Sequence, residues 1–346
     1  VIERGARALL RVFRENDGGM EQNMTVETNS VATRAMHLAF AGALAVLVAF
    51  ACMGALQVQQ ANAATPSLTG YAKAKGASSF KSAAMGKTVG KTNGKALVAV
   101  KIAKKGKLAG NVSYTVGVAG GKATAKNGKV ATKKNKLIRY LSIKLTGKLK
   151  STYHVWYRVY TKGGTWTSWV KNGAKATSAK PAKGITAFEV QYIEKGTISG
   201  STAIDKKIAK IAKSCNSDLE TCFQWCACGA GNIDYGVTGL EEIRTSGAWG
   251  DPRILQEAKL AFNTGRGDCY TYAVAFYCLA KKLGYNARPM AGTNLYTTGL
   301  SNTSWTEIKQ NGEWLFCDAM HADKDKTYVY LLSHKDYTQS YQYYSS

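Results

Sequence analysis

A cysteine between a glycine turn and a helix constrains the C-terminal part of this chain most strongly. The turn is Gly265-Arg266-Gly267-Asp268-Cys269, and the amphipathic segment from Tyr270 to Gly284 follows it directly. Glycines let the backbone turn sharply and let a substrate carbonyl come close. A thiol at a helix N-terminus meets the positive end of the dipole and free amide donors, which favour its thiolate form. The sequence therefore predicts a nucleophilic cysteine at residue 269.

The positive charge of the chain is confined to its middle. The net charge is +25 over 346 residues, and residues 64–200 hold 27 Lys or Arg against two acids, Glu189 and Glu194. Such a region attracts polyanions. Because the N-terminus indicates export, we expect the partner to be an anionic cell-wall polymer or a glycan, and not nucleic acid.

Residues 1–63 have the features of a secretory signal with some residues upstream of it. A basic flank precedes the apolar stretch 38–56, and Ala61-Asn62-Ala63 gives a small-x-small cleavage site. We expect cleavage after Ala63 and a secreted or surface-bound protein, with Met20 or Met24 as the natural start. An uncleaved anchor is the alternative, because the apolar stretch is long. Membrane contact is expected through this segment only.

Seven of the eight cysteines lie in the C-terminal part of the chain. They are Cys215, Cys222, Cys226, Cys228, Cys269, Cys278 and Cys317. In a secreted protein we expect six of them to form disulfides, which leaves Cys269 as the free thiol. The alternative is that these cysteines are free buried thiols with a structural role. Metal binding by Cys222, Cys226 and Cys228 is an alternative, but no histidine lies near and the spacing matches no zinc pattern well. We therefore expect no metal and no cofactor.

The basic region divides into two parts. Residues 64–96 are rich in Ala, Gly, Ser and Lys, which predicts a flexible basic leader. Residues 97–195 change to short alternating runs with Asn-Gly and Gly-Gly turns, which predict a small all-β domain. Two units align there with an offset of 43 to 47 residues, and their Asn-Gly turns are Asn127-Gly128 and Asn172-Gly173.

The second unit resembles the clostridial hydrophobic-tryptophan (ChW) repeat of Gram-positive secreted proteins. The residues that carry the resemblance are Tyr157-Arg158-Val159, Gly164-Thr165-Trp166-Thr167-Ser168-Trp169-Val170 and Asn172-Gly173. Family members usually have Gly directly before the Trp, whereas Thr165 intervenes here. The resemblance implies binding at the cell surface. Trp166 and Trp169 could then form an exposed platform for sugar, and the alternative is that they form the core of the β-domain.

Residues 201–346 resemble the transglutaminase-like superfamily. The matching pieces are Gly265–Ala273, Leu279–Arg288, Gly292, Ser304-Trp305-Thr306-Glu307-Ile308 and Trp314-Leu315-Phe316-Cys317-Asp318. The resemblance implies an α+β, papain-like fold in which the cysteine helix packs against an antiparallel sheet. The whole chain is then a small all-β repeat domain followed by this α+β domain.

The same resemblance implies a Cys-His-Asp triad for acyl transfer. Cys269 and Asp318 match the nucleophile and the orienting aspartate. The histidine is expected two residues before Trp305, where this chain has Thr303, and threonine cannot act as a base near neutral pH. His321, three residues after Asp318, is the candidate replacement and would need a local rearrangement.

The sequence as a whole predicts a secreted or surface-bound protein with two functional regions. A wall- or glycan-binding β-region would hold the protein in place. A transglutaminase-like domain would act on a protein or peptide substrate, as a peptidase or acyl-transferase impaired by Thr303. The alternative is a non-catalytic adhesin that uses a pseudoenzyme domain for binding.

Overall fold

The computed structural model describes residues 66–229, 231–240, 249–296, 299–322, 329–337 and 341–343. The predicted signal or anchor in residues 1–63 lies outside the described residues. Within these ranges, no helix is both long enough and apolar enough to span a membrane.

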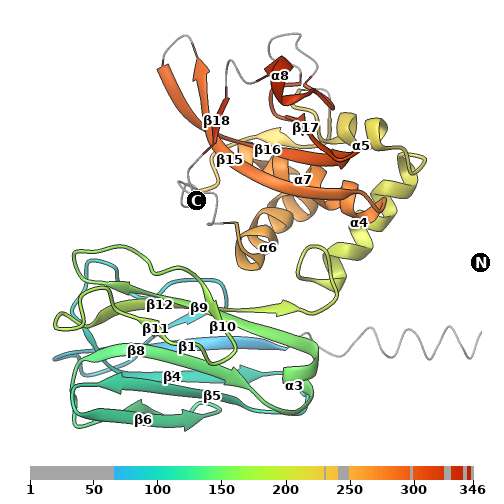
Figure 1. Cartoon of the computed structure of the whole chain (residues 1–346). Coiled ribbons are helices and arrows are strands. Elements are labelled where there is room, and N and C mark those ends of the chain that lie inside the picture. The colour runs from blue at the N-terminus through green and yellow to red at the C-terminus, as the bar shows by residue number, and fades with distance from the viewer. Residues whose placement is uncertain are drawn as a thin grey trace, which may run out of the picture. The chain divides into compact units, whose positions relative to one another are not determined.

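Between residues 66 and 200 the chain forms three four-stranded sheets and one short helix, α3 (Gly147–Thr152) (Figure 1). The first sheet has the order β2-β1-β4-β7, the second β11-β8-β5-β6 and the third β10-β9-β12-β3. The strands are β1 (Ser67–Ala74), β2 (Lys81–Ala84), β3 (Val89–Gly90), β4 (Leu97–Lys105), β5 (Val112–Val118), β6 (Gly121–Lys126), β7 (Ala131–Thr132), β8 (Ile138–Leu145), β9 (Tyr153–Thr161), β10 (Val170–Lys171), β11 (Ala176–Thr177) and β12 (Ile185–Glu194).

The three sheets share one plan. Two long antiparallel strands form the centre of each sheet: β1 with β4, β5 with β8, and β9 with β12. A hairpin partner flanks the first strand of each pair, and a two-residue strand flanks the second. The inward side chains alternate with outward ones, as in the buried and half-buried residues of β9. Their shared core includes Leu68, Tyr114 and Tyr157, all nearly inaccessible.

The hydrogen bonds at the turns repeat three times as well. The backbone N–H groups of Met85, Asn127 and Asn172 donate to the carbonyl oxygens of Leu68, Val112 and Val155 at 2.9, 3.0 and 3.0 Å. A glycine with positive φ follows each of these donors: Gly86 at +78°, Gly128 at +84° and Gly173 at +100°. The two-residue strand begins three residues after each glycine. The repeat therefore has three units, one more than the sequence predicts.

The prediction of a flexible leader at residues 64–96 is wrong for the part from β1 onward, because β1, β2 and β3 form the first repeat unit. The unit was missed because it has Met85-Gly86 where the other two have Asn-Gly, and because small residues conceal its alternation. Gly70 shows why they are small: a Cβ there would lie 2.6 Å from Val89 Cγ2. β3 pairs with β12, so the start of this domain completes the sheet that contains its last strand.

The C-terminal part is α+β, as predicted. Its elements are α4 (Thr202–Ser214), α5 (Leu219–Cys226), β13 (Asp234–Tyr235), α6 (Asp251–Lys259), the π-helical turn η2 (Leu260–Thr264), β14 (Arg266–Gly267), α7 (Cys269–Lys282), β15 (Asn286–Tyr296), β16 (Gly299–Gln310), β17 (Glu313–Cys317), α8 (His334–Tyr337) and β18 (Tyr341–Tyr343). The larger sheet is antiparallel with the order β17-β16-β15-β18. β18 comes from the aromatic C-terminal tail.

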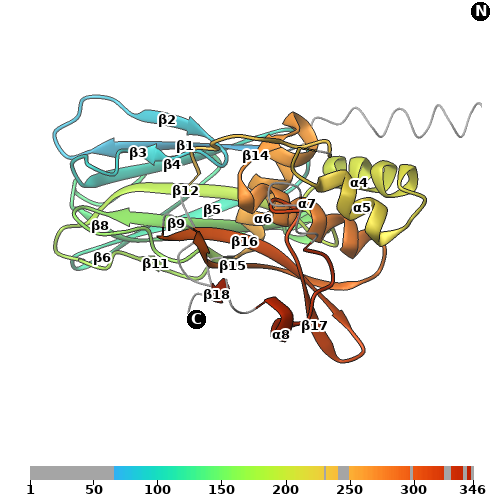
Figure 2. The same cartoon turned by 90° about the horizontal axis from the view of Figure 1, so that it is seen from above.

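The cysteine helix α7 packs against this sheet, as the resemblance implies. α7 packs on β15 and β16, and α4, α5 and α6 pack against α7 (Figure 2). The Thr306 hydroxyl on β16 donates to the carbonyl oxygen of Ala273 on α7 at 2.7 Å. Ile308 joins Phe276 of α7 in the larger core, whereas Trp305 and Phe316 stack in a separate small cluster. Contacts with the sheet thus fix the position of α7, and therefore the position of Cys269 at its first residue.

Candidate functional site

The glycine turn before Cys269 is held by a second short strand. Gly265 ends η2 with φ +61°, and β14 then runs parallel to β13. The Asp234 N–H donates to the Gly265 carbonyl oxygen, and the Gly236 N–H to that of Gly267, both at 2.8 Å. A Cβ at Gly267 would lie 2.1 Å from Thr271 Oγ1, so the close approach of turn and helix requires glycine there.

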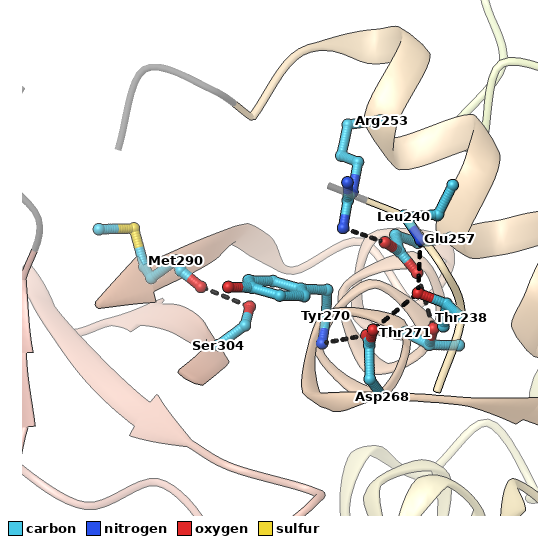
Figure 3. Close-up of polar contacts among 9 residues, drawn as sticks. All are labelled: Thr238, Leu240, Arg253, Glu257, Asp268, Tyr270, Thr271, Met290 and Ser304. Atoms are coloured by element: carbon cyan, nitrogen blue, oxygen red, sulfur yellow. Dashed lines mark hydrogen bonds and ion pairs between the residues drawn. The ribbon is translucent and has the colours of Figure 1, made fainter. Parts of the chain in front are cut away.

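Asp268 is the N-cap of α7. Its Oδ1 accepts from the Tyr270 N–H at 3.1 Å, and its Oδ2 accepts from the Thr238 hydroxyl at 2.8 Å (Figure 3). The Thr238 oxygen in turn accepts from the Leu240 N–H at 3.2 Å. A capping carboxylate satisfies helix donors that would otherwise be available to other groups. It also places a negative charge directly beside the thiol.

The structure differs from the prediction that the helix N-terminus activates Cys269. The residue is 8% exposed, and burial raises the pKa of its thiol well above the ordinary value. The charges of Asp268, Asp318 and Glu257 raise the pKa further, and only the Tyr270 N–H lowers it. Desolvation and three nearby carboxylates outweigh one helix-end donor. The resting thiol is therefore protonated at neutral pH.

Asp318 and His321 form a buried acid–imidazole pair just after β17. His321 Nδ1 lies 2.7 Å from Asp318 Oδ2, and the two residues are 5% and 1% exposed. The N–H groups of Met320 and His321 donate to Asp318 Oδ1 at 3.0 and 3.2 Å. When Nδ1 carries the proton that Asp318 accepts, the neutral ring has its lone pair at Nε2. This is the tautomer that a general base needs.

Thr303 occupies the predicted histidine position on β16, opposite Gly292 of β15. It is 1% exposed, and among the described residues its hydroxyl has no hydrogen-bond partner. A hydroxyl cannot take a proton from a thiol near neutral pH. Of the predicted site residues, Cys269 and Asp318 are thus within electrostatic reach of each other, His321 joins Asp318, and Thr303 contributes no polar contact to them.

Glu307, which belongs to the same sequence motif, has a structural role. It is fully buried and binds Arg288 through Oε2, at 2.9 Å from Nε and 2.7 Å from Nη2. Its Oε1 accepts from Trp305 Nε1 at 3.2 Å and lies 3.4 Å from His334 Nε2. The second histidine of the domain is therefore tied to this cluster and not to the Asp318 pair.

The sequence analysis missed a buried carboxylate, Glu257, whose charge acts on the Cys269 thiol. Glu257 of α6 is fully buried; its Oε2 accepts from the Thr271 hydroxyl at 2.6 Å, and its Oε1 lies 2.7 Å from Arg253 Nη2 (Figure 3). Burial is the largest cause that raises its pKa, to about 7, against the lowering effect of Arg253. The i,i+4 spacing of Arg253 and Glu257 was the available signal, but it indicates a surface pair equally well.

The predicted disulfides are not formed in this structure. All seven cysteines after residue 200 are free and buried. Cysteine behaves as a small apolar residue in such positions, and all seven, Cys269 included, belong to the larger core. In the part of the chain that the structure describes, no group of three or more His, Cys, Asp or Glu side chains is placed to hold a metal ion.

Trp166 and Trp169 lie against one arginine. Arg158 Cζ is 4.5 Å from the Trp166 ring centroid and 4.9 Å from that of Trp169, and Arg158 Nε is 2.9 Å from Glu189 Oε2. Both rings are half-buried, and within residues 66–200 neither belongs to the core. Both tryptophans thus make cation–π contacts with Arg158, which is itself ion-paired with Glu189. A role in sugar binding stays a prediction.

The chain is similar to known proteins over its C-terminal part. The family model of the transglutaminase-like superfamily matches residues 209–319. None of the curated proteins matches the sequence.

Two solved structures show a distant likeness. One is the periplasmic domain of TgpA from Pseudomonas aeruginosa bound to ethylmercury, at 12% identity and a TM-score of 0.26, covering 65% of this chain and 93% of that one. The other is a cysteine-protease candidate from Cytophaga hutchinsonii, at 12% identity and a TM-score of 0.26, covering 67% and 84%. On the family match, together with the α+β fold and the cysteine at the start of α7, residues 209–319 of this chain form a transglutaminase-like domain.

Proposed function

We propose that the transglutaminase-like domain performs thiol acyl transfer on protein or peptide amides, as a peptidase or a transferase. Cys269 is the nucleophile, His321 is the base, and Asp318 orients the imidazole. The observation that carries the proposal is the 2.7 Å contact between His321 Nδ1 and Asp318 Oδ2. Asp318 is also one of the charges that act on the Cys269 thiol, which links the pair to the nucleophile.

The proposed reaction follows from these roles. His321 Nε2 takes the thiol proton, and Cys269 Sγ attacks the amide carbon of the substrate. The imidazolium, stabilised by Asp318, returns the proton to the leaving nitrogen; the C–N bond breaks and an acyl thioester remains. Water or an amine then attacks the thioester, the C–S bond breaks, and Cys269 regains its proton through His321. Hydrolysis and transfer differ only in this last nucleophile.

The reaction is impaired by two features of the site. The thiol has a raised pKa, so few molecules hold a thiolate at neutral pH. The base comes from the segment after β17, while β16 offers only the Thr303 hydroxyl. General-base assistance is worth ~10²–10⁴ in rate, so a poorly placed base lowers turnover strongly.

The second candidate function is binding without turnover. The buried, protonated Cys269 favours it, and so does the Thr303 hydroxyl, which has no hydrogen-bond partner in the part of the chain that the structure describes. The domain would then hold a peptide at the same place, and the chain would act as an adhesin.

Alkylation of Cys269 by iodoacetamide, mapped by mass spectrometry across pH, separates these two functions. If His321 is the base, His321→Gln slows alkylation at pH 7 by about tenfold or more. His334→Gln, which removes the other histidine of the domain, leaves the rate unchanged. Equal rates in the wild type and His321→Gln, with no peptide turnover by the wild type, would overturn the catalytic proposal and support binding.

We propose in addition that the β-domain binds an anionic cell-wall polymer or glycan. Both acids of residues 64–200 are engaged: Glu189 binds Arg158 and the Thr88 hydroxyl, and Glu194 accepts from the Thr202 N–H at 2.8 Å. The lysines of this region thus face few opposing charges. Co-sedimentation with purified cell walls should fall steeply between low and high salt, and binding that ignores salt would contradict this attachment.

A location outside the cytoplasm fits both proposals. It rests on the apolar stretch 38–56 and the Ala61-Asn62-Ala63 site. N-terminal sequencing of the mature protein should begin at Ala64, and a chain that retains residues 38–56 would support the membrane-anchored alternative instead.

A further inference from the structure

Two exposed apolar side chains lie on the segment that holds the nucleophile turn. In the described parts of the chain, the large apolar residues with the greatest exposure are Val237 at 91%, Tyr235 at 50% and Val130 at 47%. Val130 belongs to the β-domain. Tyr235 and Val237 are two residues apart, and we call them the Tyr235–Val237 lip. Single exposed apolar residues are ordinary, so the position of this pair is what matters.

The lip is fixed beside Cys269 by hydrogen bonds on both sides. Tyr235 pairs with Gly267, two residues before the cysteine. The Gly236 N–H between the two lip residues donates to the Gly267 carbonyl oxygen at 2.8 Å. One residue after the lip, the Thr238 hydroxyl donates to the capping carboxylate of Asp268 at 2.8 Å. The backbone of the lip therefore keeps its place relative to the start of α7.

The phenol of Tyr235 is within electrostatic reach of the thiol. Partial burial raises the pKa of Tyr235, and the charges of Cys269, Asp268 and Cys228 raise it further. This agrees with the strand register, which places Tyr235 next to the nucleophile turn. A substrate whose amide carbon reaches Cys269 Sγ is therefore expected to bind close to the lip.

We propose that the Tyr235–Val237 lip binds a bulky apolar side chain of the peptide whose amide Cys269 attacks, and so determines which residue is accepted at the acyl position. This inference rests on the proposed function and specifies its substrate class. A peptide fits better than a lipid surface, because the lip is only two side chains wide and lies next to the start of α7, where Cys269 would attack an amide.

Peptidyl chloromethyl ketones test the lip, because Sγ displaces chloride and the rate reports how well the peptide is held. Probes with Phe and with Gly at the residue that carries the ketone are compared. We expect the Phe probe to react with wild-type Cys269 about tenfold faster than the Gly probe, as for burial of one apolar side chain. Val237→Ser and Tyr235→Ser should each reduce this ratio severalfold. Val130→Ser, a matched loss of an exposed valine, should leave the ratio unchanged.

The outcomes separate the lip from the proposed function. Equal rates for the Phe and Gly probes in the wild type, with normal labelling by iodoacetamide, would overturn the lip and leave the thiol chemistry standing. A Cys269 that no probe alkylates would overturn the proposed function instead. The lip is then tested on Cys269→Ala by NMR, with acetyl-Phe-Gly-amide and acetyl-Gly-Gly-amide as ligands. Shifts of the Val237 amide with the Phe peptide alone support the lip, and no shifts with either peptide overturn it.

Discussion

His321 Nδ1 lies 2.7 Å from Asp318 Oδ2, and both residues belong to the same short segment after β17. The transglutaminase resemblance implies a histidine from the neighbouring strand, at the position of Thr303. In this chain the imidazole that Asp318 holds thus comes from three residues further along, and not from β16. An acid–imidazole pair is therefore formed, but the segment after β17 supplies the imidazole and β16 does not.

Restoring a histidine on β16 should raise activity. Thr303→His places an imidazole at the family position, where the opposite residue, Gly292, has no side chain to displace. We expect amidase or amine-transfer activity to rise by ~10²–10⁴, the worth of a general base. Turnover of a peptide amide by the variant and the wild type measures this. A folded Thr303→His protein with wild-type turnover would show that an imidazole at the β16 position gives no better base than His321.

Removing the hydroxyl of Thr303 should stabilise the domain. The group is buried without a hydrogen-bond partner among the described residues, and an unsatisfied buried hydroxyl costs free energy. Thr303→Val keeps the shape of the side chain, and we expect the free energy of unfolding to increase by about 1 kcal/mol. Urea unfolding measures it. A loss of stability would mean that the hydroxyl has a partner in solution, such as an ordered water.

The buried carboxyl of Glu257 should make stability depend on pH. Its pKa is about 7 in the folded chain against an ordinary value of 4.5, so between these values the folded state binds more protons than the unfolded state. Stability is therefore greatest below pH ~4.5 for this group and is lost as pH rises through ~7, by about 3 kcal/mol in total.

Glu257→Gln should remove this contribution, because the amide does not ionise. Urea midpoints of the variant and the wild type, measured from pH 5 to pH 8, should diverge as pH rises. The exposed Glu313→Gln variant is the control and should follow the wild type. Parallel curves for Glu257→Gln and the wild type would contradict a raised pKa at this carboxyl.

Glu307 and Arg288 should be strongly coupled. Glu307 is fully buried, and a glutamine there loses the charge that pairs with the partly exposed Arg288 and keeps only one acceptor oxygen for Arg288 and the buried Trp305 N–H. We expect Glu307→Gln to lower the free energy of unfolding by about 2–3 kcal/mol. The double variant with Arg288→Gln should lose less than the two single losses added together. Full additivity in this cycle would show that the pair contributes nothing.

The repeated asparagines of the β-domain should have equivalent roles. Asn127 and Asn172 have φ of +46° and +50°, and their Oδ1 atoms accept from the N–H groups of Val112 and Val155 at 3.0 and 3.1 Å. Alanine loses that bond and is strained at positive φ, so each Asn→Ala variant should lose about 1–2 kcal/mol. Asn135→Ala, at φ +51°, serves as the control for strain alone. Losses no larger than that of the control would argue against a structural role for these bonds.

Local sequence features predicted much of the fold. A glycine turn, a cysteine and a 3.6-residue apolar pattern were enough for α7, because helix starts and amphipathic faces depend on neighbouring residues. The Asn-Gly turns predicted two of the three repeat units for the same reason. The first unit has no Asn-Gly, and its strands are recognised only by their partners in space, as β3 is by β12.

The protonation state of Cys269 could not be predicted from local sequence features. From the sequence alone, Cys269 stands at a helix N-terminus, which favours a thiolate. The tertiary structure decided otherwise, because it buries the thiol and brings Asp318 from beyond β17 and Glu257 from α6 toward it. The pKa of a thiol depends on the burial and the charges that all neighbouring groups impose on it, however far apart these groups are in the sequence. The sequence by itself thus predicted which cysteine is the candidate nucleophile and which helix carries it, and only the tertiary structure decided its protonation and paired His321 with Asp318.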